Sequence, residues 1–228
     1  MEAAQPQLWL IEGLPGAGKT SAAQRMHAQC EARGFRARWW LEEARDHPVT
    51  PSPLRKTAAA PDFAARCVSA FDGFVRTESG ILILEGAAFQ STVRFMFANA
   101  RSLAEMSGYV AAWAQAVTSA EPRLLILEAR DPTAHYTAFV SRTRGDLWMQ
   151  RLISYVEATP LARQRRWVGL DGFIQFWAEY QALCLELAAA LPWPIMRMGA
   201  WSEAGLFDEE AAFDFFRERP PLSTPAGR

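Results

Sequence analysis

The sequence predicts a single three-layer α/β domain in which a five-stranded parallel sheet is covered by helices on both faces. Five short apolar runs, each of a length typical of a strand, alternate along the chain with segments of helical periodicity. No linker or internal repeat divides the 228 residues, of which 50% are hydrophobic. We therefore expect one domain over residues 1–219, followed by a mobile, proline-rich tail over residues 220–228.

The first half of the chain begins with a strand over residues 8–12, a glycine-rich turn and a helix over residues 21–33. The next stretch predicts, in order, a strand over residues 36–41, a proline-rich loop over 45–61, a helix over 63–75 and a strand over 81–85. The last of these strands is a continuous apolar run, which is typical of the centre of a parallel sheet.

The second half of the chain continues the alternation. Residues 89–120 are expected to be mostly helical, with a break near Gly108. Asp131 is expected to cap a helix that starts at Pro132, because proline suits the first helical position. The remaining elements are expected to be a strand over residues 124–128, a long amphipathic helix over 170–191, a strand over 195–198 and a last helix over 208–217.

Charge and composition restrict the classes of partner. The formal net charge is −1, so no overall field favours nucleic acid or an anionic membrane. No apolar run approaches the ~18 residues of a transmembrane helix, and residues 1–6 lack the basic start of a signal peptide, which predicts a cytoplasmic protein. The three cysteines lie far apart, which disfavours a disulfide framework or a zinc site. A homodimer is compatible with this composition.

The turn after the first strand carries the strongest functional motif. Residues 13–20 read Gly-Leu-Pro-Gly-Ala-Gly-Lys-Thr and fit the pattern GxxxxGK[ST] of a phosphate-binding loop. Glycines allow backbone N–H groups to converge on phosphate oxygens, and the following helix N-terminus adds partial positive charge. The residues expected to bind ATP are Gly13, Gly16, Ala17, Gly18, Lys19, Thr20 and Ser21.

Within this loop, Lys19 is expected to reach the β- and γ-phosphates, and the Thr20 hydroxyl is expected to bind Mg²⁺. The alternative is a glycine-rich turn with a surface lysine. It is disfavoured because a strand and a helix flank the motif, as the pattern requires. Lysine is also scarce here, since arginine provides 22 of the 24 basic residues.

Carboxylates close several of the predicted strands, and ligands of parallel α/β sheets gather at these strand ends. The residues concerned are Glu42, Glu43, Glu85 and Glu128. Glu85 ends the strand expected beside the first one, where a carboxylate can organise Mg²⁺ directly or through water. The alternative for Glu85 is a solvent-facing acid.

The whole chain resembles the group of P-loop kinases that includes the thymidylate and deoxyribonucleoside kinases. Residues 124–146, LLILEARDPTAHYTAFVSRTRGD, are similar to the fourth strand, Asp-Pro helix start and arginine-bearing lid of those kinases. Residues 39–49, WWLEEARDHPV, resemble the second strand of the deoxyribonucleoside kinases with its terminal acid. The chain also resembles P-loop proteins of unassigned function that have a similar acidic stretch and His-Pro pair.

This resemblance implies ATP on the loop and a phosphate acceptor above the strand ends. It assigns the removal of the acceptor's hydroxyl proton to Glu42 or Glu43, and adjacent strand residues face opposite ways, so both remain candidates. Arg142 and Arg144 fall where a lid would stabilise the charge of the transferred phosphoryl group. Because arginine is this chain's usual surface cation, a purely solvated role is the alternative.

The sequence departs from those kinases after the third strand. They place an arginine directly after the strand's acid, whereas Gly86 follows Glu85 here. Gln90 and Arg94 are the nearest polar candidates for binding an acceptor. Without the arginine, a phosphorylated acceptor loses its expected clamp, so a nucleoside or another small hydroxyl compound is favoured over a thymidylate-type acceptor.

Two classes of function follow from these observations. The first is transfer of a phosphoryl group from Mg-ATP to a small hydroxyl acceptor. The alternative is a regulatory nucleotide-binding NTPase without small-molecule kinase activity. A GTPase switch is disfavoured because no NKxD motif occurs, and a nucleic-acid motor is disfavoured by size and charge. His27 and His135 are expected to be surface or packing residues, and His47 is a minor candidate for contact with the acceptor.

Overall fold

The computed structural model describes residues 6–200 and 207–218, and the tail expected over residues 220–228 lies outside them. The sheet has five strands in the order β2-β3-β1-β4-β5, and every neighbouring pair is parallel. The strands are β1 (Gln7–Gly13), β2 (Ala37–Trp40), β3 (Ile81–Glu85), β4 (Arg123–Glu128) and β5 (Ile195–Gly199). This confirms the predicted five-stranded parallel sheet.

The middle of the sheet is fully buried, because β1 lies between β3 and β4 and helices cover both faces. The four residues from Leu8 to Ile11 are all 0% exposed. In the register, Trp9 pairs with Ile83 of β3, and Gly13 pairs with Leu127 of β4. The chain therefore leaves β1 at the centre of the sheet's carboxyl edge, which places the glycine-rich turn there.

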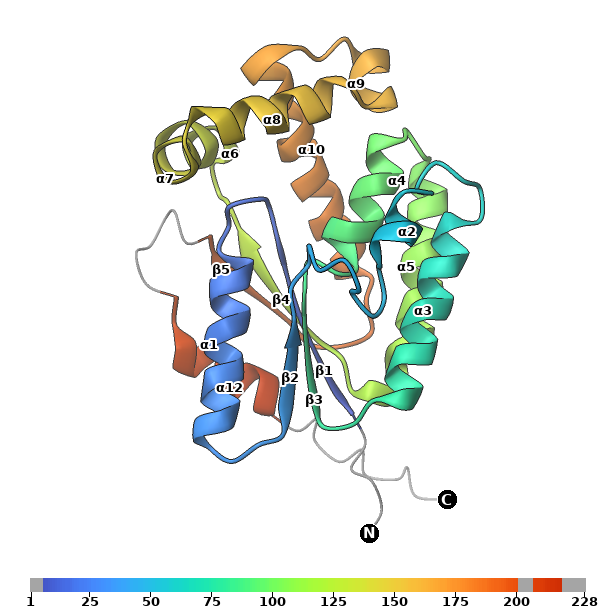
Figure 1. Ribbon diagram of the computed structural model, residues 1–228, viewed down its shortest axis with the longest axis vertical. Helices are drawn as coiled ribbons and strands as arrows, with labels where there is room; N and C mark the ends of the chain where they lie inside the picture. The colour runs from blue at the N-terminus through green and yellow to red at the C-terminus, as the bar shows by residue number, and fades with distance from the viewer. Residues whose placement is uncertain (1–5, 201–206, 219–228) are drawn as a thin grey trace.

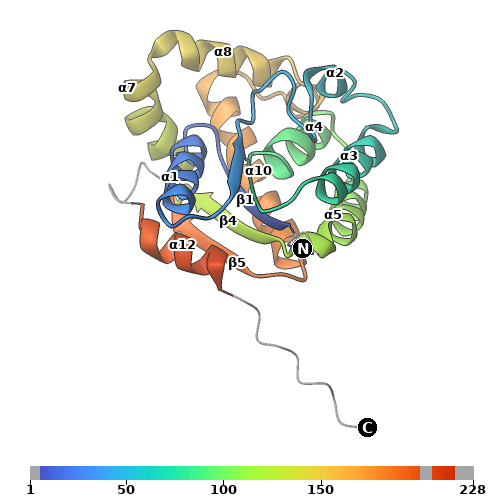
Figure 2. The same cartoon turned by 60° about the horizontal axis from the view of Figure 1, so that its bottom comes forward.

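Helices form a layer on each face of the sheet (Figures 1 and 2). Helices α1 (Lys19–Ala32) and α12 (Glu209–Arg217) lie on one face, and α3 (Phe63–Thr77), α5 (Leu103–Val117) and α10 (Gly169–Ala189) on the other. The Trp9 ring joins the sheet to α12 by stacking on Phe216, with the ring centres 4.8 Å apart. The predicted three-layer arrangement is confirmed.

A group of short helices lies above the carboxyl ends of the strands (Figure 1). This group, called the lid below, consists of α6 (Pro132–Ala134), the π-helical turn η3 (His135–Val140), α7 (Ser141–Arg144), α8 (Asp146–Glu157) and α9 (Pro160–Arg165). The side chain of Asp131 accepts a hydrogen bond from Ala134 N at 3.0 Å, as the predicted helix start requires. Within the described residues, no helix combines the length and apolarity needed to cross a bilayer.

Residues 89–120 differ from the prediction, because the helix is not broken near Gly108. The segment instead comprises η1 (Phe89–Val93), α4 (Arg94–Ala98), α5 and the 3-10 turn η2 (Thr118–Ala120), with the break between α4 and α5. There Ala100 has a left-handed φ of 54°, and Ser102 and Glu105 form a reciprocal capping box. Gly108 is an exposed residue inside α5. The loop expected over 45–61 also contains one short helix, α2 (Ser52–Arg55).

The capping box generates a test of this correction. Ser102 Oγ accepts a hydrogen bond from Glu105 N at 3.2 Å, so Ser102→Ala should cost about 1 kcal/mol and lower the melting temperature by roughly 2–4 °C. Ser107→Ala, on the exposed surface of the same helix, should leave the melting temperature unchanged or raise it slightly. Equal melting temperatures for the Ser102→Ala and wild-type proteins would contradict the assigned helix start.

Candidate active site

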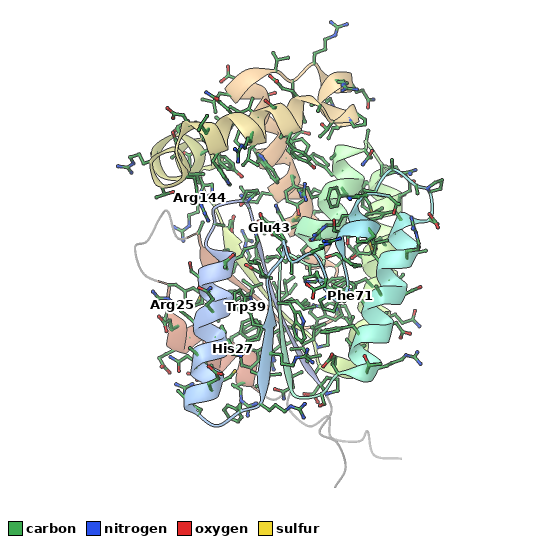
Figure 3. All side chains as sticks on the ribbon, viewed as in Figure 1. Arg25, His27, Trp39, Glu43, Phe71 and Arg144 are labelled. Carbon is green, nitrogen blue, oxygen red and sulfur yellow. The ribbon has the colours of Figure 1, made fainter. Side chains whose placement is uncertain are left out.

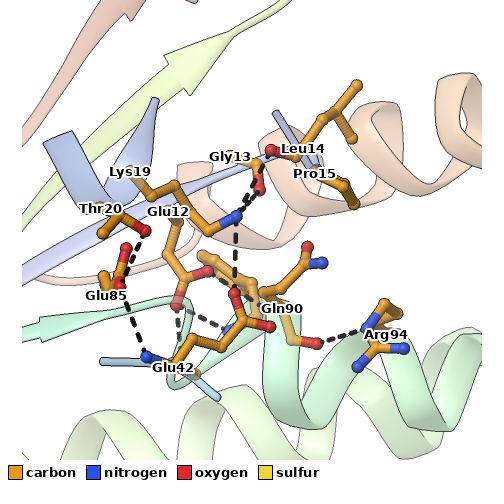
Figure 4. A network of polar contacts seen from close by, with 12 residues as sticks. Glu12, Gly13, Leu14, Pro15, Lys19, Thr20, Glu42, Glu85, Gln90 and Arg94 are labelled. Carbon is orange, nitrogen blue, oxygen red and sulfur yellow. Dashed lines mark hydrogen bonds and ion pairs between the residues drawn. The ribbon is translucent and has the colours of Figure 1, made fainter. Parts of the chain in front are cut away.

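The glycine-rich loop connects β1 to the first turn of α1, and Lys19 folds back over it (Figure 4). Lys19 Nζ donates hydrogen bonds to Gly13 O at 3.2 Å and Leu14 O at 3.4 Å. Gly16 has a φ of 83°, and a Cβ there would lie 2.6 Å from Val140 Cγ2 of η3. Glycine is therefore needed at this position both for backbone conformation and for contact with the lid.

His135 contacts the same loop, a role that no pattern in the sequence indicates. The side chain is buried, and its Nε2 donates a hydrogen bond to Pro15 O at 3.0 Å. The lid is thus held directly on the loop. His47 is also buried, but it does not line the site. Its Nδ1 accepts hydrogen bonds from Val49 N and Thr50 N, and burial lowers its pKa to about 4.

Thr20 and Glu85, the two predicted metal ligands, meet across the end of β3. Thr20 Oγ1 donates a hydrogen bond to Glu85 Oε1 at 3.0 Å. Glu85 is fully buried, which raises the pKa of its carboxyl group, and its Oε2 has no hydrogen-bond partner among the described residues. A buried, unpartnered carboxylate oxygen beside a hydroxyl fits a bound cation.

No group of three or more His, Cys, Asp or Glu side chains in the described ranges could hold a metal ion by itself. A cation at Thr20 and Glu85 would therefore complete its coordination with ligand oxygens or water, which is how Mg²⁺ is commonly held beside nucleotide phosphates. Thr20 and Glu85 are therefore residues that could hold Mg²⁺ together with such ligand oxygens.

The structure distinguishes between the two candidate bases at the end of β2. Glu42 points inward, with its Oε2 3.6 Å from Lys19 Nζ, and its backbone N–H donates to Glu85 Oε1 at 3.4 Å. Glu43 is exposed at the rim of the site (Figure 3). Arg55 of α2 holds this turn by donating a hydrogen bond to Glu42 O at 2.6 Å. Arg55 was not among the predicted residues, because nothing in the sequence places α2 beside this turn.

Gly86, which directly follows the acid of β3, lies against the Glu42 side chain. A Cβ at this position would lie 2.3 Å from Glu42 Oε2, and Gly86 has a φ of 59°. The space that a side chain at position 86 would take is thus occupied by the Glu42 carboxylate. Glycine at position 86, where the kinases have arginine, leaves room for the inward-pointing Glu42 side chain.

A cavity of about 850 Å³ joins these residues under the lid. The loop wall consists of Pro15, Gly16, Gly18, Lys19, Thr20 and Ser21. The opposite wall consists of Gln90, Arg94, Trp148, Leu152, Tyr155 and Trp177. Leu41, Glu42, Glu43, Glu85, Thr143 and Arg144 line the space between them. The two predicted acceptor residues therefore share one cavity with the loop.

The two predicted lid arginines differ in whether they line the cavity. Arg144, the last residue of α7, is exposed but lines the cavity, and in Figure 3 it lies on the side of the lid that faces the sheet. Arg142 is exposed on α7 and does not line the cavity, and its Nε donates to Ala138 O within the lid itself. Glu128 likewise lies apart, because its Oε2 pairs with Arg197 Nη2 of β5 at 2.6 Å. Position along the sequence alone could not separate these residues.

Glu12 is a buried acid at the end of the first strand, and the sequence indicates no site role for it. It is 2% exposed, and its carboxylate accepts hydrogen bonds from the backbone N–H groups of Ala88, Phe89 and Gln90. Burial raises the pKa of Glu12 to about 7 against the opposing effect of these hydrogen bonds. An acid closing an apolar strand just before the loop was the available signal, but its partners were not visible in the sequence.

No protein-family model and no curated protein matches the chain. Among solved structures, it is similar to the YorR protein of Bacillus subtilis in complex with phosphorylated GDP, with 12% identity, 91% and 92% of the two chains covered and a TM-score of 0.45. It is also similar to a deoxyadenosine kinase of M. mycoides with bound dATP, with 10% identity, 91% and 96% covered and a TM-score of 0.44. A gluconokinase from Sinorhizobium meliloti shows 9% identity, 93% and 90% covered and a TM-score of 0.42.

These likenesses are distant and say nothing about what this chain binds. The fold is clear from its own geometry, with β1 at the centre of a parallel sheet and a glycine-rich loop leading from it into α1. The chain has the predicted α/β fold, a five-stranded parallel sheet with a loop of the pattern GxxxxGK[ST] at its carboxyl edge.

The close packing at Gly86 can be tested by substitution. Gly86→Ala should cost roughly 1–3 kcal/mol, mainly because the positive φ is unfavourable for alanine, and the new Cβ would also displace the carboxylate end of the Glu42 side chain. Gly73→Ala is the matched control, since Gly73 lies within α3 and a Cβ there meets nothing within 4 Å. Denaturant unfolding should show a loss for the first variant and none for the second. Equal stabilities would contradict the left-handed backbone conformation of Gly86.

Proposed function

We propose that this chain is a small-molecule kinase, which transfers the γ-phosphoryl group of Mg-ATP to a hydroxyl group of a small acceptor. One observation carries the proposal, namely the single cavity of about 850 Å³ that has the loop on one side and Gln90 and Arg94 on the other. Phosphoryl transfer depends on placing a donor and an acceptor together in a space from which water is excluded. A cavity with two such walls can hold a donor and an acceptor side by side.

The donor phosphates would lie against the loop between β1 and α1. Its backbone N–H groups and the N-terminus of α1 favour an anion there. Lys19, which is 7% exposed and now bonded to Gly13 O and Leu14 O, would turn its ammonium group to the β- and γ-phosphates. Thr20 and Glu85 would hold Mg²⁺, which when bound neutralises part of the phosphate charge.

Glu42 is the base in this proposal. The acceptor's hydroxyl oxygen attacks the γ-phosphorus, the bond from that phosphorus to the β–γ bridging oxygen breaks, and ADP leaves. The hydroxyl proton passes to the Glu42 carboxylate. Glu42 is favoured over Glu43 because its carboxylate points to Lys19, with Oε2 3.6 Å from Nζ, whereas Glu43 is exposed.

The other wall of the cavity would hold the acceptor. Arg94 donates from Nη1 to Tyr155 Oη at 2.6 Å, and the side chain of Gln90 is buried with no hydrogen-bond partner for its Oε1 in the described structure. An unpartnered amide oxygen can accept a hydrogen bond from a polar acceptor molecule. Arg144 is the lid arginine placed to stabilise charge on the transferred group, since it lines the cavity and Arg142 does not.

Substitution of Lys19 tests the donor side. Lys19→Ala should reduce ATP affinity and lower turnover at least about 100-fold, because a preorganised charged donor to the phosphates is lost. Lys56→Ala removes the one other lysine of the chain, an exposed residue outside the cavity, and should leave both unchanged. Calorimetric ATP titration and ADP release measure the two quantities. Full affinity and turnover in Lys19→Ala would refute the assignment of the loop.

An acceptor screen tests the kinase activity itself. ADP release should rise above basal hydrolysis with at least one member of a panel of nucleosides, nucleotides, sugars and amino alcohols. With that acceptor, Glu42→Gln should lower kcat by roughly 10²–10⁴-fold, because the base is lost. Glu43→Gln should lower it less than about tenfold. If ATP binds tightly and no acceptor raises turnover, the kinase proposal fails and a regulatory NTPase becomes the better description.

A further inference from the structure

Glu12 occupies a special position between the two walls of the cavity. It is the last residue of β1 before Gly13, where the loop begins, and its side chain extends toward the segment after β3 (Figure 4). In the described part of the chain it forms no ion pair with lysine, arginine or histidine, although it is only 2% exposed. A buried carboxylate without an ion-pair partner depends largely on the hydrogen bonds it accepts.

All three of these hydrogen bonds come from consecutive backbone N–H groups at the start of η1. Glu12 Oε1 accepts from Ala88 N at 2.9 Å and from Phe89 N at 3.0 Å, and Oε2 accepts from Gln90 N at 3.1 Å. These donors belong to the first turn of the helical segment formed by η1 and α4, where N–H groups lack partners within the helix. One side chain therefore fixes the beginning of that segment to the end of β1.

The same segment carries the wall assigned to the acceptor. Gln90 is itself one of the three residues held, and Arg94 follows one turn later with its Nε donating to Gln90 O at 2.7 Å. Arg94 then reaches Tyr155 of α8 in the lid. A short chain of contacts thus runs from the loop through Glu12 to Gln90, Arg94 and the lid.

We infer that Glu12 is a positioning residue for the acceptor, setting where Gln90 and Arg94 lie relative to the phosphate-binding loop. The inference rests on the proposed function, since it concerns the alignment of acceptor and donor. Glu12 does not line the cavity and need not touch either substrate. Its effect is geometric, because small displacements of a bound reactant strongly reduce the rate of transfer.

Glu12→Gln is the test, with Glu128→Gln as the control at the end of a neighbouring strand. The oxygen of the glutamine can still accept from the N–H groups of Ala88 and Phe89. Its amide N–H₂ would face the N–H of Gln90, and because both groups are donors, that hydrogen bond would be lost. We expect the acceptor KM to rise at least about tenfold while the Kd for ATP stays within about twofold. Glu128→Gln should change neither quantity.

Amide hydrogen exchange provides a readout that needs no acceptor. The amides of residues 88–90 should exchange at least about tenfold faster in Glu12→Gln than in the wild-type protein, while those of residues 16–20 keep their rates. If the kinase proposal fails in the acceptor screen, this measurement decides alone whether Glu12 fixes the segment. Glu12→Asp, in which the carboxylate is retained on a shorter side chain, should fall between the wild type and Glu12→Gln, and it replaces that variant if the latter does not fold.

Two outcomes would overturn the inference. One is an unchanged exchange rate at residues 88–90 in the folded variant, because the carboxylate would then not hold them. The other is an equal loss of affinity for ATP and acceptor together with faster exchange throughout the chain, which would show a purely structural role.

Discussion

The burial of two carboxylates and one ammonium group beside a third, partly exposed carboxylate at a single edge of the sheet is the constraint on which the rest of the site depends. Glu12, Lys19, Glu42 and Glu85 meet where β1 and β3 end, and the two strand-end acids Glu12 and Glu85 are buried. Burying charge without partners is costly, so each group must be neutralised or hydrogen-bonded. Lys19 forms an ion pair with Glu42, and Thr20 donates a hydrogen bond to Glu85. Backbone N–H groups donate hydrogen bonds to Glu12.

The backbone around these groups is built to admit them. Gly86, Ala87 and Ala88 are buried and small, so the carboxylates of Glu12 and Glu42 can approach the chain after β3. A larger side chain in this stretch would compete with the carboxylates for the same volume. The positions of the Glu12 and Glu42 carboxylates therefore depend on the small residues beside them. A larger residue in that stretch would force these carboxylates to move.

Most of the fold and about half of the site could be predicted from the sequence, for identifiable physical reasons. Strand ends and the loop motif are local patterns, so Lys19, Thr20 and Glu85 were placed correctly relative to the sheet. Contacts between distant segments leave no such pattern, which is why Glu12, Arg55 and His135 were missed. The helix break was predicted at Gly108 because glycine is a weak helix former. The observed break lies before Ser102, where Ala100 has a left-handed conformation and Ser102 caps α5.

The lid is attached at two separate places, and this limits how the cavity can open. His135 holds the start of the lid on the loop through Pro15 O, and Tyr155 receives a hydrogen bond from Arg94 near the end of α8. While both hydrogen bonds hold, residues 135–155 cannot swing outward about a single hinge, and breaking either bond costs about 0.5–3 kcal/mol. Exchange of molecules with solvent then depends on bending of the part between the attachments, residues 141–154, and the stiffness of that stretch would set the residence time of whatever the cavity holds.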